Sequence, residues 1–213
     1  MPKAPGECKG VVKGFSHGGR AAPSHPVRGV PALDLLAPAR HLGAMPPLKP
    51  DELLARLAAM DIQTSTVSHP PIFTVEEGRD HWRFIPGAHC KNLFLKDEKG
   101  ALFLLVALEN AEIRLNKLHK RIGCKRLSFA RTELLMEVLG VAPGSVTPFA
   151  LVHDTERRVT VLLDAAMMRN ELLNYHPLSN DMTTTIRRED LLKFLRGLGY
   201  EPREIDLEGL GEA

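Results

Sequence analysis

Chemical groups able to bind a small polar or anionic ligand occur in three separate segments of this sequence. The first begins with Lys91 and Asn92, at the start of an apolar run that ends in Lys96. The ammonium group of Lys91 could contact a phosphate or a carboxylate, and Asn92 adds amide donors and an acceptor beside it. Alternation along a strand predicts that Lys91 and Lys96 point to opposite faces. The simpler interpretation is a solvated lysine at a strand end.

The second segment is a loop that runs from Gly144 to Pro148. Glycine allows another backbone to approach closely, and proline fixes the direction in which the chain leaves. The exposed N–H and C=O groups of Ser145, Val146 and Thr147 could then bind a small polar ligand. A plain connection between a helix and a strand is the alternative.

The third segment, residues 176–185, is a dense polar run between two apolar stretches. It contains histidine, asparagine and threonine but neither lysine nor glutamate, and such short side chains suit oriented hydrogen bonds better than solvation. A solvated loop is the alternative.

Common catalytic motifs are missing from the sequence. It has no GxSxG elbow, P-loop, GxGxxG or HExxH pattern, which removes most common hydrolase, kinase and dehydrogenase classes. His89 and Cys90 are adjacent, so on a strand they point to opposite faces and cannot easily form a nucleophile–base pair. The histidines show no metal-ligand spacing. We therefore expect neither a metal nor an organic cofactor.

Hydrophobic periodicity and chain breakers place these segments in an α/β domain. Hairpins and helical crossovers both occur, which favours a single domain with a central mixed β-sheet flanked by helices. The run 101–108 is apolar on both faces, which is typical of a central strand. Predicted strands are 64–68, 91–96, 101–108, 150–153, 159–163, 172–175 and an edge strand 204–207. Predicted helices are 52–60 capped by Asp51, one from the capping box 74–77 to Pro86-Gly87, 115–122 ending at Gly123, 127–139 capped by Ser128 and ending at Gly140, and 189–198 ending at Gly199.

Composition divides the chain into two parts. Residues 1–48 hold six basic and two acidic residues, eight prolines and seven glycines, whereas the whole chain has a net charge of +2. Such a segment cannot bury enough apolar surface to offset its ordering entropy, so we expect a disordered basic tail. Translation beginning at Met45 is the alternative, and a targeting peptide fits less well because an apolar core is missing. Residues 49–213 form the predicted domain.

The cysteine count and hydropathy limit the cellular setting. Three cysteines without a CxxC pair exclude a disulfide scaffold and a zinc ribbon, and they fit a reducing compartment. No apolar stretch approaches the ~18 residues that span a membrane. We expect a cytoplasmic protein with no membrane partner. The near balance of charge argues against a nucleic-acid coat protein, although a basic group within 117–126 could contact phosphates.

Four longer motifs in a fixed order point to a known family. The sequence resembles the YbaK/prolyl-tRNA-synthetase editing-domain superfamily in HPPIFTVEE (69–77), HCKNLFLKD (89–97), GVAPGSVTPFAL (140–151) and YHPLSNDMTTTI (175–186). Within it, HPLSNDMTTT is most similar to the free-standing alanyl-tRNA(Pro) deacylases, known as ProXp-ala or PrdX. The resemblance covers about 49–210 and implies the editing-domain fold. It also implies hydrolysis of the ester between alanine and the terminal adenosine of mischarged tRNA(Pro), with the substrate 2′-OH assisting the water.

The resemblance further implies roles for individual residues. Lys91 matches the family's essential lysine and would anchor the terminal phosphate, with Asn92 beside it in the motif. Gly144 and Pro148 match a GxxxP loop, whose backbone at 145–147 would hold the aminoacyl group. The implied pocket residues are His176, Asn180, Thr183 and Thr184, and the implied contacts to the acceptor stem are Lys96 and Arg126.

Three functions remain open at this point. The first is an Ala-tRNA(Pro) deacylase, which would meet the acceptor end of mischarged tRNA(Pro) and could associate with prolyl-tRNA synthetase. The second is a deacylase for Cys-, Ser- or Thr-tRNA, because sister subfamilies use the same lysine and GxxxP loop. The third is a non-catalytic tRNA-binding module on the same fold.

Overall fold

The computed structural model describes residues 46–71 and 84–210. The predictions for the tail before residue 46 and for a helix starting at the capping box 74–77 lie outside the described residues. Within the described part, none of the helices has the length and apolar character needed to cross a membrane. The helical elements are α1 (Pro50–Ala59), α3 (Leu115–Ile122), α4 (Thr132–Leu139), α5 (Arg188–Gly197) and the short 3₁₀ turns η1 (Pro148–Val152) and η2 (Met167–Arg169).

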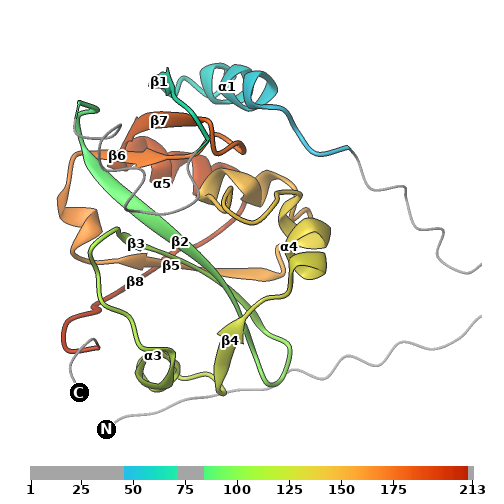
Figure 1. Cartoon of the computed structure of the whole chain (residues 1–213), viewed down its shortest axis with the longest axis vertical. Helices are drawn as coiled ribbons and strands as arrows, with labels where there is room; N and C mark the ends of the chain where they lie inside the picture. Colours follow the sequence, from blue (N-terminus) through green and yellow to red (C-terminus); the bar gives the residue numbers. More distant parts are fainter. Residues whose placement is uncertain (1–45, 72–83, 211–213) are drawn as a thin grey trace, which may run out of the picture. The chain divides into compact units, whose positions relative to one another are not determined.

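A mixed sheet of eight strands organises the domain (Figure 1). Its order is β1-β7-β6-β2-β3-β5-β8, with β4 paired to the end of β2. Antiparallel pairs join β2 with β3 and β6 with β7, whereas β2–β6, β3–β5 and β5–β8 are parallel. The strands are β1 (Thr64–Ser68), β2 (Ala88–Asp97), β3 (Leu102–Leu108), β4 (Leu127–Phe129), β5 (Val159–Asp164), β6 (Leu172–Tyr175), β7 (Met182–Arg187) and β8 (Arg203–Ile205).

Both faces of the central strands are covered by packed apolar side chains. Leu104 belongs to a cluster that includes residues of α1, α4, η1 and α5, and its neighbour Leu105 belongs to a second cluster with residues of α3 and the C-terminal segment. Both side chains are fully buried. Alternate residues of one strand therefore serve two cores, which explains why the run 101–108 is apolar throughout.

Much of the predicted architecture is confirmed. The hairpin of β2 and β3, the central place of β3, the strands 64–68 and 172–175, and the edge position of β8 all occur as expected. Helix α3 has the predicted bounds, and Gly123 ends it in the left-handed conformation. The last helix begins and ends one residue earlier than predicted.

The predicted helix over 127–139 is wrong in its first part. Leu127–Phe129 is strand β4, which pairs with Leu95–Asp97 at the end of β2. The helix begins only at Thr132, so Ser128 does not cap it and instead donates to the Lys96 carbonyl at 3.4 Å. A free sheet edge beside these residues outweighs their helical periodicity, because pairing satisfies backbone groups that the strand end would leave open.

Three smaller predictions also differ. The expected strand 150–153 is the 3₁₀ turn η1, because Pro148 starts it and the Thr147 hydroxyl accepts from Phe149 N at 3.4 Å. Helix α1 starts at Pro50, so Asp51 lies in its first turn and the Lys49 N–H is satisfied by Glu52 at 2.8 Å. The polar run after residue 181 is strand β7 rather than a loop.

Candidate functional site

Asn92 connects β2 to the glycine–proline loop. Its amide Nδ2 donates to the Val146 carbonyl at 2.9 Å, so the first and second predicted segments do meet. The other amide atom, Oδ1, is buried and has no hydrogen-bond partner among the described residues. A buried acceptor without a partner costs free energy, which makes this atom suited to a ligand donor.

The loop from Gly144 to Pro148 has a defined turn at its start. Gly144 has φ +88°, and Ser145 N donates to the Ala142 carbonyl at 3.0 Å. Proline at the first central position and glycine at the second are typical of a type II turn, which needs positive φ at the second. Thr147 and Pro148 are buried, and they lead into η1.

Two backbone donors of this loop face no described acceptor. Ser145 N is used in the turn, but no hydrogen bond within residues 46–71 and 84–210 takes up the N–H of Val146 or of Thr147. Adjacent backbone N–H groups of this kind can polarise a carbonyl or hold a carboxylate. The loop therefore offers donors close to the Asn92 amide.

Lys91 belongs to a different environment. Its ammonium donates to the Ala111 carbonyl, on the segment that follows β3. Burial lowers the pKa of Lys91 below its usual value, although the carboxylates of Glu109, Glu112 and Asp164 oppose that change. The polar contacts of Lys91 are thus with this acidic segment rather than with loop 144–148, as the alternation of neighbours along a strand requires.

The third predicted segment is held by hydrogen bonds at both of its ends. His176 Nδ1 is 2.8 Å from the Met182 carbonyl, so Nδ1 carries the hydrogen and closes the loop between β6 and β7. Leu178 inside this loop has φ +68°, a conformation that side chains rarely adopt. Asn180 lies in the same loop and is half-buried.

The threonines of this segment form the start of strand β7. Thr183 and Thr184 are buried at 3% and 0% exposure. Thr184 Oγ1 lies 2.9 Å from Thr66 Oγ1 on the adjoining strand β1, and Thr183 Oγ1 lies 2.9 Å from His69 Nε2. A threonine run can thus be a buried strand when its hydroxyls find partners across the sheet.

His69 is a residue of this site that the sequence reasoning missed. Its ring centroid is 6.1 Å from that of His176, and its Nδ1 is 2.8 Å from the Pro70 carbonyl. In the neutral ring Nδ1 therefore carries the hydrogen, and Nε2 accepts from the Thr183 hydroxyl. The available signal was the HPP motif, which predicts only a fixed extended loop.

Protonation of His176 is disfavoured in the fold. Burial lowers the pKa of His176, and the nearby rings of His69 and His89 add to that effect, against the opposing contributions of the Met182 carbonyl and Asp181. The ring is therefore neutral at pH 7. Its Nε2 then holds a lone pair, because Nδ1 carries the hydrogen.

The thiol of Cys90 is buried and protonated, which makes it a poor nucleophile. Burial raises the pKa of its thiol to about 12, so the thiolate is scarce at neutral pH. This agrees with the expectation that the His89–Cys90 pair is structural. Among the described residues, no group of three or more His, Cys, Asp or Glu side chains is placed to hold a metal ion.

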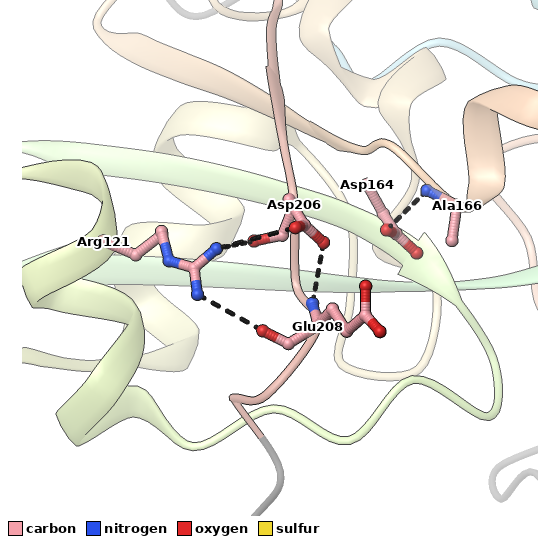
Figure 2. A network of polar contacts seen from close by, with 5 residues as sticks. All are labelled: Arg121, Asp164, Ala166, Asp206 and Glu208. Atoms are coloured by element: carbon pink, nitrogen blue, oxygen red, sulfur yellow. Dashed lines mark hydrogen bonds and ion pairs between the residues drawn. The ribbon is translucent and has the colours of Figure 1, made fainter.

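Two hollows on the described surface lie away from the contact between Asn92 and loop 144–148. One, of about 730 Å³, is lined by the end of β2, by β4 and by the start of α4, and includes Lys96. The other, of about 510 Å³, lies between the segment after β3 and the C-terminal segment. In Figure 2, Arg121 reaches from α3 to this C-terminal segment, where it donates to the carbonyls of Asp206 and Glu208 at 2.9 and 3.2 Å.

The predicted tRNA-contact residues lie at the far end of β2 from Lys91. Lys96 is five residues further along the strand, which corresponds to about 17 Å. Arg126 is also exposed, and a hydrogen bond from Glu98 N to the Arg126 carbonyl at 3.2 Å holds its segment beside the end of β2. Both side chains are exposed and make no side-chain hydrogen bond or ion pair within the described part of the chain.

Comparison with known proteins gives a consistent result. A family model described as the aminoacyl-tRNA editing domain matches residues 69–194. Prolyl-tRNA synthetase associated domain-containing protein 1 of Danio rerio is 39% identical over 153 residues, which cover 71% of this chain and 83% of that protein. The prolyl-tRNA editing protein ProX of Acetoanaerobium sticklandii is 31% identical over 160 residues, covering 73% of this chain and 95% of that protein.

The fold also has a solved counterpart. A crystal structure of a proposed trans-editing enzyme for prolyl-tRNA synthetase superposes with a TM-score of 0.53 at 20% identity, over 67% of this chain and 85% of that one. That likeness concerns the fold, whereas the matched family residues include β2, loop 144–148 and the start of β7. This chain therefore belongs to the aminoacyl-tRNA editing domain family.

Proposed function

We propose that this protein hydrolyses the ester of mischarged Ala-tRNA(Pro). The observation that carries the proposal is the Asn92 junction, where a buried acceptor without a partner and two backbone donors of loop 144–148 lie together. Membership of the editing family and the similarity to ProX support the same conclusion.

The reaction requires no covalent intermediate. Water attacks the ester carbonyl, the bond from the carbonyl carbon to the ribose oxygen breaks, and the ribose oxygen leaves with a proton. The products are alanine and a tRNA with a free 3′ end. An aminoacyl ester is already reactive, so polarising its carbonyl and orienting water, with help from the substrate 2′-OH, suffice. The protonated Cys90 thiol takes no part.

Lys91 would bind the phosphate of the terminal nucleotide. In the free protein its ammonium donates to a neutral carbonyl, that of Ala111. An ammonium–phosphate contact is charge-assisted and stronger than a bond to a carbonyl. Binding would therefore exchange the weaker partner for the stronger one, and Asn92 on the other face would meet the aminoacyl end.

The threonines favour a small amino acid without a hydroxyl. Thr183 donates to His69, Thr185 donates to Asn174 at 2.7 Å, and one hydroxyl of the Thr66–Thr184 pair donates to the other. Of the four hydroxyl hydrogens on these threonines, three are therefore donated in hydrogen bonds within the protein. A bound serine or threonine would find few donors there, whereas alanine needs none.

Hydrolysis of charged tRNAs by the full-length chain tests the proposal. Ala-tRNA(Pro), Pro-tRNA(Pro), Cys-tRNA(Pro) and Ser-tRNA(Pro) are compared, and we expect rapid loss of alanine alone. Loss of cysteine or serine instead would keep the family activity but reject alanine as the substrate. Tight tRNA binding without turnover on any of the four would reject the enzyme and leave a binding module.

A lysine substitution tests the anchor within the same assay. We expect Lys91→Ala to lower kcat/KM by roughly 100-fold or more, because a charge-assisted contact to the reacting end is lost. Lys193→Ala is the matched control, since the Lys193 ammonium also donates to a backbone carbonyl, that of Asp61 at 3.3 Å, on the surface of α5. Full activity of a folded Lys91→Ala protein would refute the anchor role.

A further inference from the structure

The buried carboxylate of Asp97 joins two loops that are distant in the sequence. Asp97 ends strand β2 and is 6% exposed. Its Oδ1 accepts from Lys99 N at 2.8 Å and from Ala101 N at 2.9 Å, which closes the β2–β3 turn. Its Oδ2 accepts from Lys125 N at 3.3 Å, on the segment between α3 and β4. One side chain thereby fixes the turn and the 124–126 segment to each other.

The two joined loops lie at the end of the domain where α3, β4 and the β2–β3 turn meet (Figure 1). The loops and the adjoining end of β2 carry exposed cations. None of these cations makes a side-chain hydrogen bond or ion pair to any described residue. These residues, which we name the Asp97 surface, are Lys96 on β2 beside the turn, Lys99 in the turn, and Lys125 and Arg126 in the 124–126 segment.

Two cations of helix α3, by contrast, bond to the C-terminal segment. Arg121 bonds to the carbonyls of Asp206 and Glu208 and lies 3.9 Å from the Asp206 carboxylate, as Figure 2 shows. Lys117 donates to the Gly209 carbonyl at 3.4 Å. The basic group expected between 117 and 126 is thus divided: Lys117 and Arg121 bond to the C-terminal segment, whereas the side chains of Lys125 and Arg126 bond to none of the described residues.

The ionisation state of Asp97 favours a stable link between the two loops. Desolvation by burial raises the pKa of its carboxyl, but the hydrogen bonds from the backbone N–H groups of Ala101, Lys125 and Lys99 together lower it by more. The pKa of Asp97 therefore lies below its usual value. The carboxylate is therefore ionised at pH 7 and accepts all three bonds. Glu98 is exposed in the same turn, and Glu133 and Glu137 line the hollow that Lys96 borders.

We propose that Asp97 is a positioning residue for tRNA, which holds the turn and the 124–126 segment so that their free cations meet successive phosphates of the acceptor stem. This proposal rests on the proposed function in one respect only, which is that tRNA is taken as the ligand. A phosphate backbone presents charges at fixed spacing, so cations on two loops bind it together only if the loops are fixed to each other. Asp97 itself touches no nucleotide.

An isosteric substitution tests the hydrogen bond from Lys125 N to Asp97 separately from those of the turn. In Asp97→Asn the single amide oxygen can still accept from Lys99 and Ala101, while the amide NH₂ is left opposite the Lys125 N–H. The turn is then kept and the link to the 124–126 segment is broken. Asp154→Asn is the matched control, because Asp154 is 5% exposed and accepts from Arg158 N and Val159 N in another turn.

The experiment measures binding of uncharged tRNA(Pro) to the full-length protein at several salt concentrations. We expect Asp97→Asn to raise Kd about tenfold and to lower the slope of log Kd against log salt by about one, the effect of one lost phosphate contact. In deacylation, KM should rise while kcat stays within about twofold. Asp154→Asn should lower the melting temperature without changing either binding quantity.

A surface substitution keeps the test decisive if Asp97→Asn folds poorly. Lys125→Gln leaves the backbone N–H and Asp97 intact, and it should reproduce the smaller salt slope. Unchanged Kd and slope in a folded Asp97→Asn protein would refute the proposal. An equal increase of Kd in Asp97→Asn and Asp154→Asn would also refute it. Because the ligand is uncharged tRNA, these outcomes do not depend on whether alanine is the amino acid removed.

Discussion

At the scale of single residues, neighbours on one strand serve two regions of the protein. Lys91 contacts the acidic segment after β3, and Asn92 contacts loop 144–148 on the opposite face. Under the proposed function, Lys91 would hold the phosphate of the tRNA end and Asn92 would meet its aminoacyl group. Adjacent motif residues can thus hold different parts of one ligand.

His176 makes a prediction for the pH dependence of stability. Its pKa is lower in the fold than the usual 6.5, so the unfolded chain binds the proton more readily. Stability from this group is therefore complete above pH 6.5 and is lost as the pH falls below that value. His176→Asn keeps a donor for the Met182 carbonyl but cannot titrate, so its melting temperature should fall less between pH 7 and pH 5.5. Parallel pH profiles of the two proteins would contradict this assignment.

At the scale of elements, strand β2 connects most of the site. Its start pairs with β6, its middle with β3 and its end with β4. It enters the sheet through Gly87, which has φ +103°, and a Cβ there would lie 2.9 Å from the Leu172 carbonyl oxygen. Glycine is required at this entry for two reasons, the positive φ and the close backbone approach.

Gly87→Ala should therefore destabilise the domain more than an ordinary left-handed glycine would. Gly123→Ala is the control, because Gly123 has φ +79° but a Cβ there meets nothing within 4 Å. We expect Gly123→Ala to lower the free energy of unfolding by about 1 kcal/mol and Gly87→Ala by about 2–4 kcal/mol. Denaturant titration measures both, and equal losses would show that the contact with Leu172 yields without cost.

At the scale of the whole molecule, residues just before α1 already belong to the folded unit. Leu48 N donates to His153 Nε2 at 2.9 Å, and the Leu48 side chain packs against the main core. The same ring donates from Nδ1 to the Leu139 carbonyl at 2.8 Å, so His153 links the chain before α1 to the end of α4. Among the described residues, the compact unit therefore begins before α1.

Shortened chains test where this unit begins. A chain of residues 44–213 should keep the melting temperature and the deacylation rate of the full-length protein. A chain of residues 49–213 loses the Leu48 contacts, and it should lose about 1–3 kcal/mol of stability. Thermal melts and deacylation assays of the three chains make the comparison. A lower deacylation rate with an unchanged melt in 44–213 would assign the tail a role in activity.

The errors of sequence reasoning share one cause. Leu127–Phe129 reads as helix by its periodicity, and it is a strand only because the end of β2 lies beside it. The threonines at 183–185 are expected from the sequence in a polar run suited to oriented hydrogen bonds and not in a strand, and they form a buried strand because Thr66, His69 and Asn174 accept or donate to them. In both cases the deciding partner is remote in the chain, and local periodicity carries no information about it.

The sequence by itself determined the family, the α/β class, the central place of β3 and the glycine ends of α3 and α4, since each depends on a motif or on periodicity within a short window. Only the tertiary structure decided that Asn92 rather than Lys91 touches loop 144–148, that the His69 ring meets Thr183, and that Asp97 joins the β2–β3 turn to the 124–126 segment. These outcomes depend on which buried donors find which acceptors, and that pairing exists only after the strands have assembled.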